Sequence, residues 1–180
     1  MTTGSPAEFE AFVQRHARFV FRVAYAVLLH AHDAEDAVQE TFLKLYRNGG
    51  WQQAHNERAF LARTAWRVAV DLRPQAQLLG GAEIDIPDAA DGISSSEPTP
   101  ERLALIADEH ARIHALIDAL PEQLRLPLVL ASFEELNSRE TAAVLGIPEG
   151  TVRTRLQRAR AILREKLSRL QGRAPEVHHG

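Results

Sequence analysis

The sequence predicts an all-α protein made of two small helical domains joined by a flexible acidic linker, with a helix-turn-helix in the C-terminal domain. Apolar residues recur at helical spacing on both sides of a central segment, and no alternating strand pattern of useful length occurs. The central segment is acidic and rich in Gly, Ser and Pro, a composition that cannot bury enough surface to fold. The expected ranges are 6–74, 75–100 and 101–171.

Composition limits the classes of protein to which the chain can belong. It has 180 residues, 45% of them hydrophobic, a net charge of -3 and no cysteine, so it can form neither disulfides nor thiolate metal sites. Its apolar runs are too short to span a membrane, and its N-terminus lacks the basic and apolar regions of a secretory signal. We therefore expect a cytoplasmic protein without membrane insertion.

Three helices are expected in the first domain. The first runs from Pro6 to about Leu29, and its apolar stripe consists of Phe9, Phe12, Val13, Val20, Val23 and Val27. Asp33 is the expected cap of the second helix, whose inward residues are Val38, Phe42 and Leu45. The third begins near Asn56 and stops before Pro74, and its buried stripe is Leu61, Ala65, Val68 and Leu72.

The outward faces of the second and third helices are candidate binding surfaces. The second helix presents Asp36, Gln39, Glu40, Leu43 and Arg47. A leucine among charged residues fits a docking patch about as well as it fits an ordinary solvated face. The third helix presents Arg63, Trp66 and Arg67, and the loop before it carries Trp51. Aromatic rings beside arginines suit unstacked bases of single-stranded DNA, although isolated tryptophans are more often core or rim residues.

The second domain opens with an amphipathic helix whose expected stripe is Leu103, Ile106, His110, Ile113 and Ile117. Another helix starts at Pro121, and Pro127 inside it removes a hydrogen bond and is expected to kink it. These two helices should form the apolar floor under the pair of helices that follows.

The stretch 138–173 carries the most information about function. Asn137 and Glu140 have the spacing of a capping box, Gly146 can end the first helix in a left-handed conformation, and Pro148 suits the first turn of the next helix. The buried stripe of that next helix is Val152, Leu156, Ala159 and Leu163. Its opposite face is Arg153, Thr154, Gln157, Arg158 and Ala161.

Positive charge is concentrated on this last helix. Positions 151–173 hold eight basic residues and one acidic residue, a net charge of +7 in a chain whose total is -3. Such a concentration indicates a polyanionic partner. A basic helix that is merely solvated, or that docks on an acidic protein, is the alternative, but the cap, the glycine turn and the tight spacing favour a DNA-binding helix-turn-helix.

Four stretches resemble, in order and spacing, the extracytoplasmic-function (ECF) class of bacterial sigma factors. They are DAEDAVQETFLKLY (33–46), RAFLARTAWRVAVD (58–71), LPEQLRLPLVL (120–130) and ETAAVLGIPEGTVRTRLQRARAILREKL (140–167). The most specific part, GIPEGTVRTRLQRAR, closely follows the family's recognition-helix pattern. The resemblance implies a promoter-specificity subunit of RNA polymerase that directs transcription initiation, is not an enzyme and needs no cofactor or metal.

The resemblance also assigns roles to residues. Asp36, Gln39, Glu40 and Leu43 would dock on the clamp helices of the polymerase β′ subunit. Trp51, Arg63, Trp66 and Arg67 would meet the flipped base and the opened strand of the minus-ten element. The second domain would lie under the β flap and read the minus-thirty-five element of promoter DNA through Glu149, Thr151, Arg153, Thr154, Gln157 and Arg158. An inhibitory anti-sigma factor is common in the family, and the free protein is expected to be a monomer.

Two features depart from the family pattern. Arg67 stands where the family often has asparagine, and the stretch after Asp71, LRPQAQ, lacks the run of arginines that is common there. Fewer cations at this point predict weaker phosphate contacts beside the minus-ten element.

Three other classes are alternatives. A stand-alone helix-turn-helix regulator that does not bind polymerase would leave the patch from Asp36 to Arg47 without a partner. A helical adaptor for an acidic protein would show little salt-dependent DNA binding. An enzyme is the weakest candidate, because no phosphate-binding glycine loop or nucleophile-base set occurs. The histidines also lack a metal-ligand pattern, and the pairs considered are His30 and His32, His110 and His114, and His178 and His179.

Overall fold

The computed structural model describes residues 5–49, 51–52, 54–73 and 100–171. Within these ranges the chain forms seven α-helices and no strand, which confirms the all-α class. The expected linker over 75–100 lies outside the described residues except for Pro100, which begins a helix. No helix in the described ranges is both long and apolar enough to cross a bilayer.

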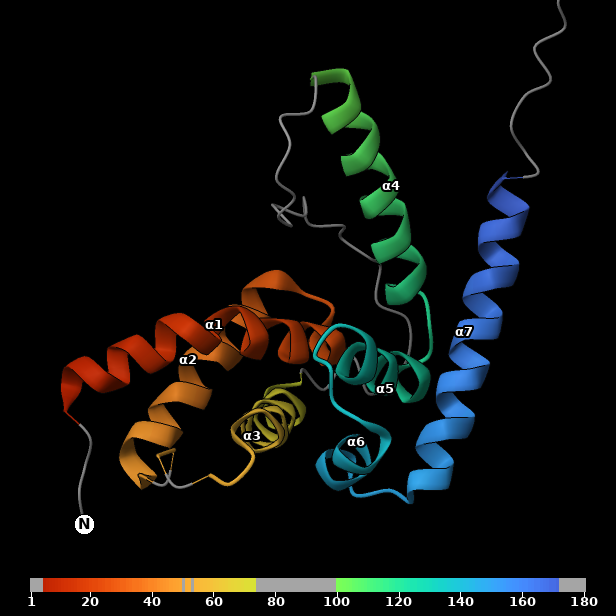
Figure 1. Ribbon diagram of the computed structural model, residues 1–180. Helices are drawn as coiled ribbons and strands as arrows, with labels where there is room; N and C mark the ends of the chain where they lie inside the picture. Colours follow the sequence, from red (N-terminus) through yellow and green to blue (C-terminus); the bar gives the residue numbers. More distant parts are fainter. Residues whose placement is uncertain (1–4, 50, 53, 74–99, 172–180) are drawn as a thin grey trace, which may run out of the picture.

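The first three helices form the N-terminal half (Figure 1), and they are α1 (Pro6–Leu28), α2 (Ala31–Asn48) and α3 (Glu57–Leu72). Ser5 and Glu8 form a capping box at the start of α1. Asn56, near which the third helix was expected to begin, is the N-cap of α3. The expected cap of α2 was wrong. His30 is its N-cap and accepts a hydrogen bond from the backbone N–H of Asp33 at 3.4 Å, so that Asp33 lies inside the first turn.

The expected apolar stripes of these helices meet in a buried core. Val20, Val23 and Leu61 are fully buried. One member was placed wrongly, because Leu72 is 42% exposed. Leu72 is the last residue of α3, and it lies at the end of the stripe, beyond the buried core.

The C-terminal half consists of α4 (Pro100–Asp118), α5 (Glu122–Ser132), α6 (Ser138–Leu145) and α7 (Glu149–Gln171). Every residue of α5 from Leu124 to Leu130 is buried, including Pro127, and α5 continues past this proline. In Figure 1, α4 rises away from α5, and its Ile117 is buried whereas His110, expected on the same stripe, is exposed. The side chains of Leu103 and Ile106 lie outside the described residues.

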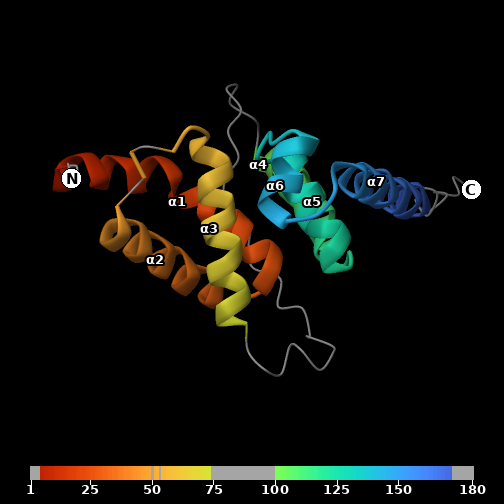
Figure 2. The ribbon, with the colours of Figure 1, turned by 90° about the horizontal axis from the view of Figure 1, so that it is seen from below.

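The two halves pack directly against each other. α1 contacts α5, α3 contacts α6, and α7 lies on the far side of the C-terminal half (Figure 2). The buried apolar side chains of both halves belong to one contiguous cluster. α3 therefore lies against the C-terminal half, whereas α7 is turned away from the N-terminal half.

Candidate nucleic-acid interface

α6 and α7 form the expected helix-turn-helix, and local sequence determines its shape. The Asn137 side chain accepts from the Glu140 N–H at 2.9 Å, and the Glu140 carboxylate accepts from the Asn137 N–H at 2.8 Å. Gly146 ends α6 with φ of 66°, a left-handed conformation that costs glycine little. Pro148 stands just before α7 rather than inside it, and its carbonyl accepts the first helical hydrogen bonds. The turn is thus bounded by a defined end of α6 and a defined start of α7.

The inward stripe of α7 anchors the pair. Val152 and Ala159 are fully buried and Leu156 is 6% exposed, while Leu163 is half-buried. α7 packs on both α5 and α6, so these residues hold the helix at a fixed orientation. The expected stripe is confirmed.

The outward face of α7 is open to solvent over the residues expected to read DNA. Arg153, Thr154, Gln157 and Arg158 are exposed, and Glu149 and Thr151 are half-buried. Arg153 forms an ion pair with Glu149 one turn earlier, and the Thr154 hydroxyl donates to the Gly150 carbonyl at 3.0 Å. Within the described residues no hydrogen bond engages the side chains of Gln157 or Arg158, which leaves both available for base edges.

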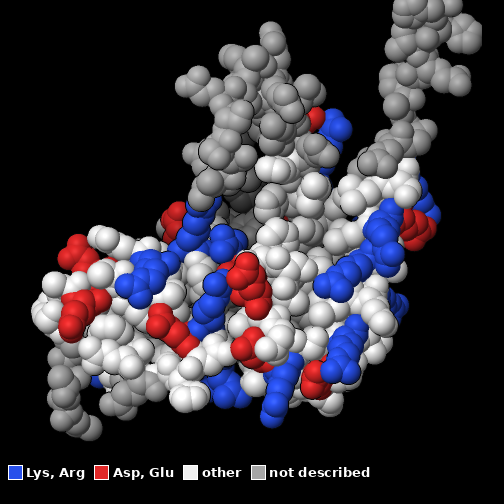
Figure 3. All heavy atoms as spheres, viewed as in Figure 1, with Lys and Arg blue, Asp and Glu red and all other residues white. Residues whose placement is uncertain are grey.

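Basic side chains continue along α7 beyond this reading face. Figure 3 shows them as a blue band over α7, whereas acidic and basic side chains alternate over the N-terminal half. The exposed members are Arg153, Arg158, Arg160, Arg164 and Arg169. Arg155 is different, because it is half-buried and turns toward α5.

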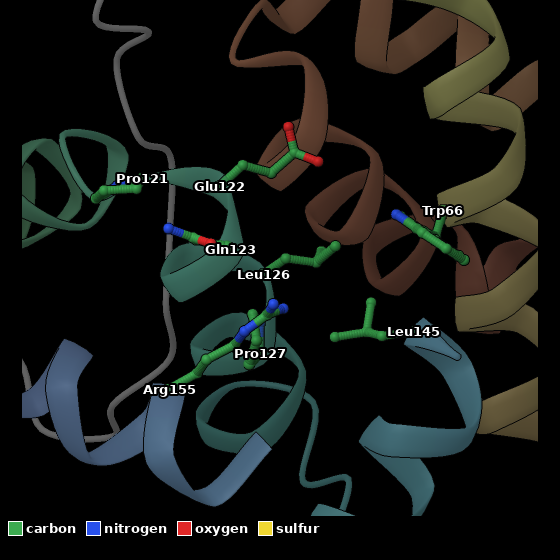
Figure 4. Close-up of a pocket in the computed structure, with 8 residues that line it drawn as sticks. All are labelled: Trp66, Pro121, Glu122, Gln123, Leu126, Pro127, Leu145 and Arg155. Carbon is green, nitrogen blue, oxygen red and sulfur yellow. The ribbon is translucent and has the colours of Figure 1, made fainter. Parts of the chain in front are cut away.

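The residues expected to face the minus-ten element lie against the other half of the protein. Arg63 donates to the Ala143 carbonyl of α6 at 2.8 Å. Trp66 is half-buried and lines an open cleft of ≈ 440 Å³ together with Leu145 of α6 and Arg155 of α7. Figure 4 shows Trp66 and Leu145 approaching this cleft from opposite halves. Arg63 and Arg67 are both exposed, and Trp66 is the half-buried member of this set on α3.

Trp51 is part of an aromatic cluster at the end of the bundle. Its ring centroid lies 4.8 Å from that of Phe12 and 5.3 Å from that of Phe9. The side chain is half-buried, so it is a rim residue that is partly open to solvent. The structure therefore brings Trp66 and Arg63 together on α3 and leaves Trp51 in a separate cluster.

The residues expected to form a docking patch lie on the outward face of α2. Asp36, Gln39 and Leu43 are exposed, and Glu40 is half-buried and 4.0 Å from Lys44. Sequence reasoning missed Tyr46, which is 47% exposed beside Leu43 at 45%. Its spacing of three residues from Leu43 was the available signal, since such pairs share a helix face.

The described side chains hold no group of three or more histidine or acidic residues placed to bind a metal. In the described ranges, the basic outer face of α7 and the outward face of α2 are open to solvent.

Comparison with known families finds one match in each half of the chain. The family model for sigma-70 region 2 matches residues 12–77, and the model for sigma-70 region 4 matches residues 110–163. The ECF RNA polymerase sigma-E factor of Escherichia coli K12 is 30% identical over 172 residues, covering 89% of this chain and 88% of the relative. This chain belongs to the ECF class of RNA polymerase sigma factors. It is therefore a sigma subunit of RNA polymerase, a DNA-binding regulatory protein of transcription initiation.

Other relatives agree. The RNA polymerase sigma-H factor of Pseudomonas aeruginosa is 30% identical, covering 93% of this chain and 90% of the relative. The ECF sigma factor SigE of Mycolicibacterium smegmatis is 32% identical over 162 residues, but this chain spans only 62% of its length.

Two solved structures share the fold. One is the sigma factor RpoE of Bartonella quintana in complex with the anti-sigma factor NepR, with a TM-score of 0.66 and 19% identity. The match covers 89% of this chain and 97% of the RpoE chain. CnrH in complex with the cytosolic domain of CnrY has a TM-score of 0.61 at 24% identity and covers 92% of this chain and 90% of its own.

Proposed function

We propose that this sigma factor reads the minus-thirty-five element with α7 and the minus-ten element with α3 while α2 holds it on core RNA polymerase. On this assignment the N-terminal half acts as a region 2 domain over 6–74, and the C-terminal half acts as a region 4 domain over 101–171 joined to it by the linker 75–100. The observation that carries the proposal is the open, basic outer face of α7 on a helix-turn-helix that is closed at both ends.

An α-helix fits the major groove, where each base pair presents a distinct pattern of donors and acceptors. Gln157 and Arg158 are the best placed to read it, because both are exposed one turn into the face. Glutamine pairs with adenine and arginine with guanine through two hydrogen bonds each. Arg153 reaches DNA only if it exchanges its ion pair with Glu149 for a phosphate or base, which makes Glu149 a residue that orients Arg153.

The minus-ten element must be opened, and opening needs a surface on which extruded bases can stack. Trp66 with Arg63 and Arg67 on α3 would supply this surface, and the half-buried Trp51 would supply a second ring. The exposed patch of Asp36, Gln39, Glu40 and Leu43 would contact the β′ clamp helices, with Tyr46 extending its apolar part. The C-terminal half would lie under the β flap.

Two further expectations follow from the relatives. The solved neighbours are held in complexes with an anti-sigma factor and with the CnrY cytosolic domain, and we propose that this chain also has an inhibitory protein partner. Because its targets would be polymerase and promoter DNA, we place it in the cytoplasm. It needs no chemistry of its own for this function.

Gel filtration with bacterial core RNA polymerase tests the docking assignment. The Leu43→Ala variant should lose comigration with the polymerase, whereas Leu72→Ala, a leucine of nearly equal exposure (42% against 45%) on α3, should keep it. Equal behaviour of the two variants would remove α2 from the interface.

Promoter footprints of the assembled holoenzyme test the reading face. Gln157→Ala and Arg158→Ala should each lower specific affinity by ~1 to 3 kcal/mol, the value of one bidentate pair between a side chain and a base. Arg169→Ala is the matched control, because Arg169 is also exposed on α7 but pairs with Glu165 near the far end. An unchanged footprint for both reading variants would refute the assignment of α7 to the minus-thirty-five element.

A further inference from the structure

The two halves are fastened by a buried carboxylate. Glu134, in the turn between α5 and α6, has no exposed side-chain surface. Its carboxylate pairs with Arg22 of α1, including a 3.1 Å hydrogen bond from Nη2, and with Nη2 of Arg58 in α3 at 3.4 Å. The hydrogen bond with Glu134 raises the pKa of Arg22, so that this arginine stays charged. Both cations come from the other half, so burial of Glu134 is compensated only while the halves are together.

Further polar contacts join the halves on either side of Glu134. Arg73, at the end of α3, pairs with Glu122 of α5 at 2.7 Å, and Asn56 donates to Glu140 of α6 at 2.6 Å. The buried Arg125 donates from α5 to the Ala26 carbonyl of α1 at 2.7 Å. Charged and polar groups recover their hydration when they separate, which offsets part of the cost of exposing the apolar side chains that the two halves also share.

The contact has a consequence for DNA binding. α6 lies on α3 and accepts the hydrogen bond from Arg63, and Leu145 closes one side of the cleft that Trp66 lines (Figure 4). α7, by contrast, lies on the far side of the molecule (Figure 2), with its reading face exposed. This conformation therefore presents the minus-thirty-five reader and covers part of the minus-ten reader.

We propose that this sigma factor closes on itself, with Glu134 between Arg22 and Arg58 acting as a latch that keeps α6 over the minus-ten face of α3 until the halves are drawn apart. The inference rests on the proposed role of α3. The chain allows the opening, because the 26 residues from 74 to 99 can span up to ~90 Å when extended.

Charge reversal on an arginine tests the latch in the full chain. Arg58→Glu places a second carboxylate beside Glu134, and it also removes the guanidinium that lies 5.2 Å from the centroid of the Phe19 ring. The Arg58 side chain is 45% exposed. Arg15→Glu is the matched control, since it makes the same charge change at an exposed position of α1. Because the chain has no cysteine, spin labels on Gln14→Cys and Ser168→Cys report the distance between the halves without background labels.

The wild type and Arg15→Glu should give one narrow distance distribution, and Arg58→Glu should give a longer and broader one. Adding Glu134→Gln to Arg58→Glu removes the repulsion and should return the distance toward that of the wild type, which loss of folding would not allow. A broad distribution in the wild type, or an unchanged one in Arg58→Glu, would overturn the latch.

Quenching of Trp66 tests whether closure covers α3. With Trp51→Phe, Trp66 is the only tryptophan left of two, and Arg58→Glu should raise its quenching constant with acrylamide about twofold as α6 leaves. A longer distance between the halves without increased quenching would overturn the covering of α3. Neither measurement contains DNA or polymerase, so neither depends on the minus-ten assignment. That assignment has its own test, because it would fail if the Trp66→Ala holoenzyme melted promoters normally.

Discussion

Replacement of Arg125 by methionine should destabilise the protein by ~3 kcal/mol. The Arg125 guanidinium is the donor to three backbone carbonyls, those of Ala26 at 2.7 Å, Asp118 at 2.9 Å and Leu120 at 2.6 Å. Methionine keeps the apolar stem but leaves these three acceptors without their donor. The residue is 5% exposed, so water replaces the guanidinium poorly.

The magnitude follows from two opposing contributions. A hydrogen bond to a charged group contributes ~1.5 to 3 kcal/mol, so three bonds contribute at most ~5 to 9 kcal/mol. Burial of the guanidinium opposes this by several kcal/mol, and the same burial lowers the pKa of Arg125. The remainder, ~2 to 5 kcal/mol, corresponds to a fall in Tm of ~10 °C at a slope of about 2 to 4 °C per kcal/mol.

Urea unfolding with two probes measures the effect and locates it. Trp51 packs among aromatic residues of the N-terminal half, whereas Trp66 lines the cleft between the halves. In a Trp66→Phe background, fluorescence therefore reports the N-terminal half while circular dichroism reports all helices. Two of the three bonds lie within the α4–α5 connection, and if the halves unfold separately only the circular dichroism transition should shift strongly. Arg164→Met, at an exposed arginine of α7, should change stability by less than ~0.5 kcal/mol. A decrease below ~1 kcal/mol in Arg125→Met would refute the reasoning.

Three other changes have defined outcomes. Burial and the hydrogen bond to Asp118 raise the pKa of Tyr25 from 10.0 to about 12, so the folded state holds this proton more tightly and stability should fall as pH rises through that interval. In Tyr25→Phe, the free energy of unfolding should lack the fall with rising pH that the Tyr25 hydroxyl causes. Glu135 has φ of 57°, and Glu135→Gly should stabilise the protein by ~1 kcal/mol in urea unfolding, unlike Glu135→Ala. Replacing Arg160 and Arg164 by alanine should lower the salt slope of duplex DNA binding by ~0.9 for each phosphate that is no longer neutralised, and an unchanged slope would show that neither arginine touches the DNA backbone.

Local chemistry in the sequence was enough to predict most of the helices. The cap at Asn137, the left-handed Gly146 and the stripe from Val152 to Ala159 are all properties of neighbouring residues, and each is found as expected. The errors occurred at helix ends. Asp33 was predicted as the cap of α2, but His30, an unusual acceptor at this position, is the N-cap. The predicted buried stripe of α3 included Leu72, which lies at the helix end and is exposed.

The site was predictable only where it depends on one helix. The exposed face of α7 follows from its periodicity, because the buried stripe determines which residues point away. Tyr46 could have been added to the α2 patch by the same rule. The roles of Trp51 and Trp66 stayed open in the sequence, and the structure half-buries both, one in an aromatic cluster and one beside α6.

Contact between the halves could not be predicted, since it depends on pairs far apart in the chain. Glu134 and Arg22 are separated by 112 residues, and Glu134 is followed by a second glutamate that is exposed. The pattern of apolar residues in the sequence does not indicate which of these two glutamates is buried. The left-handed conformation of Glu135 turns the chain at this point, which leaves Glu134 buried and Glu135 in solvent.

On the proposed assignment, the same contact would keep the two DNA-reading surfaces of one chain in different states. A latch made of apolar side chains would be hard to reverse, because opening it would expose them all to water. Arg22 and Arg58 are already 41% and 45% exposed in the closed form, so of these three side chains only Glu134 changes from buried to solvated on opening. The halves also share buried apolar side chains, so the ion pairs of Glu134 contribute one part of the energy that holds the halves together. A partner that offers α3 a stronger set of contacts, such as polymerase with opened promoter DNA, must outweigh both parts to release it.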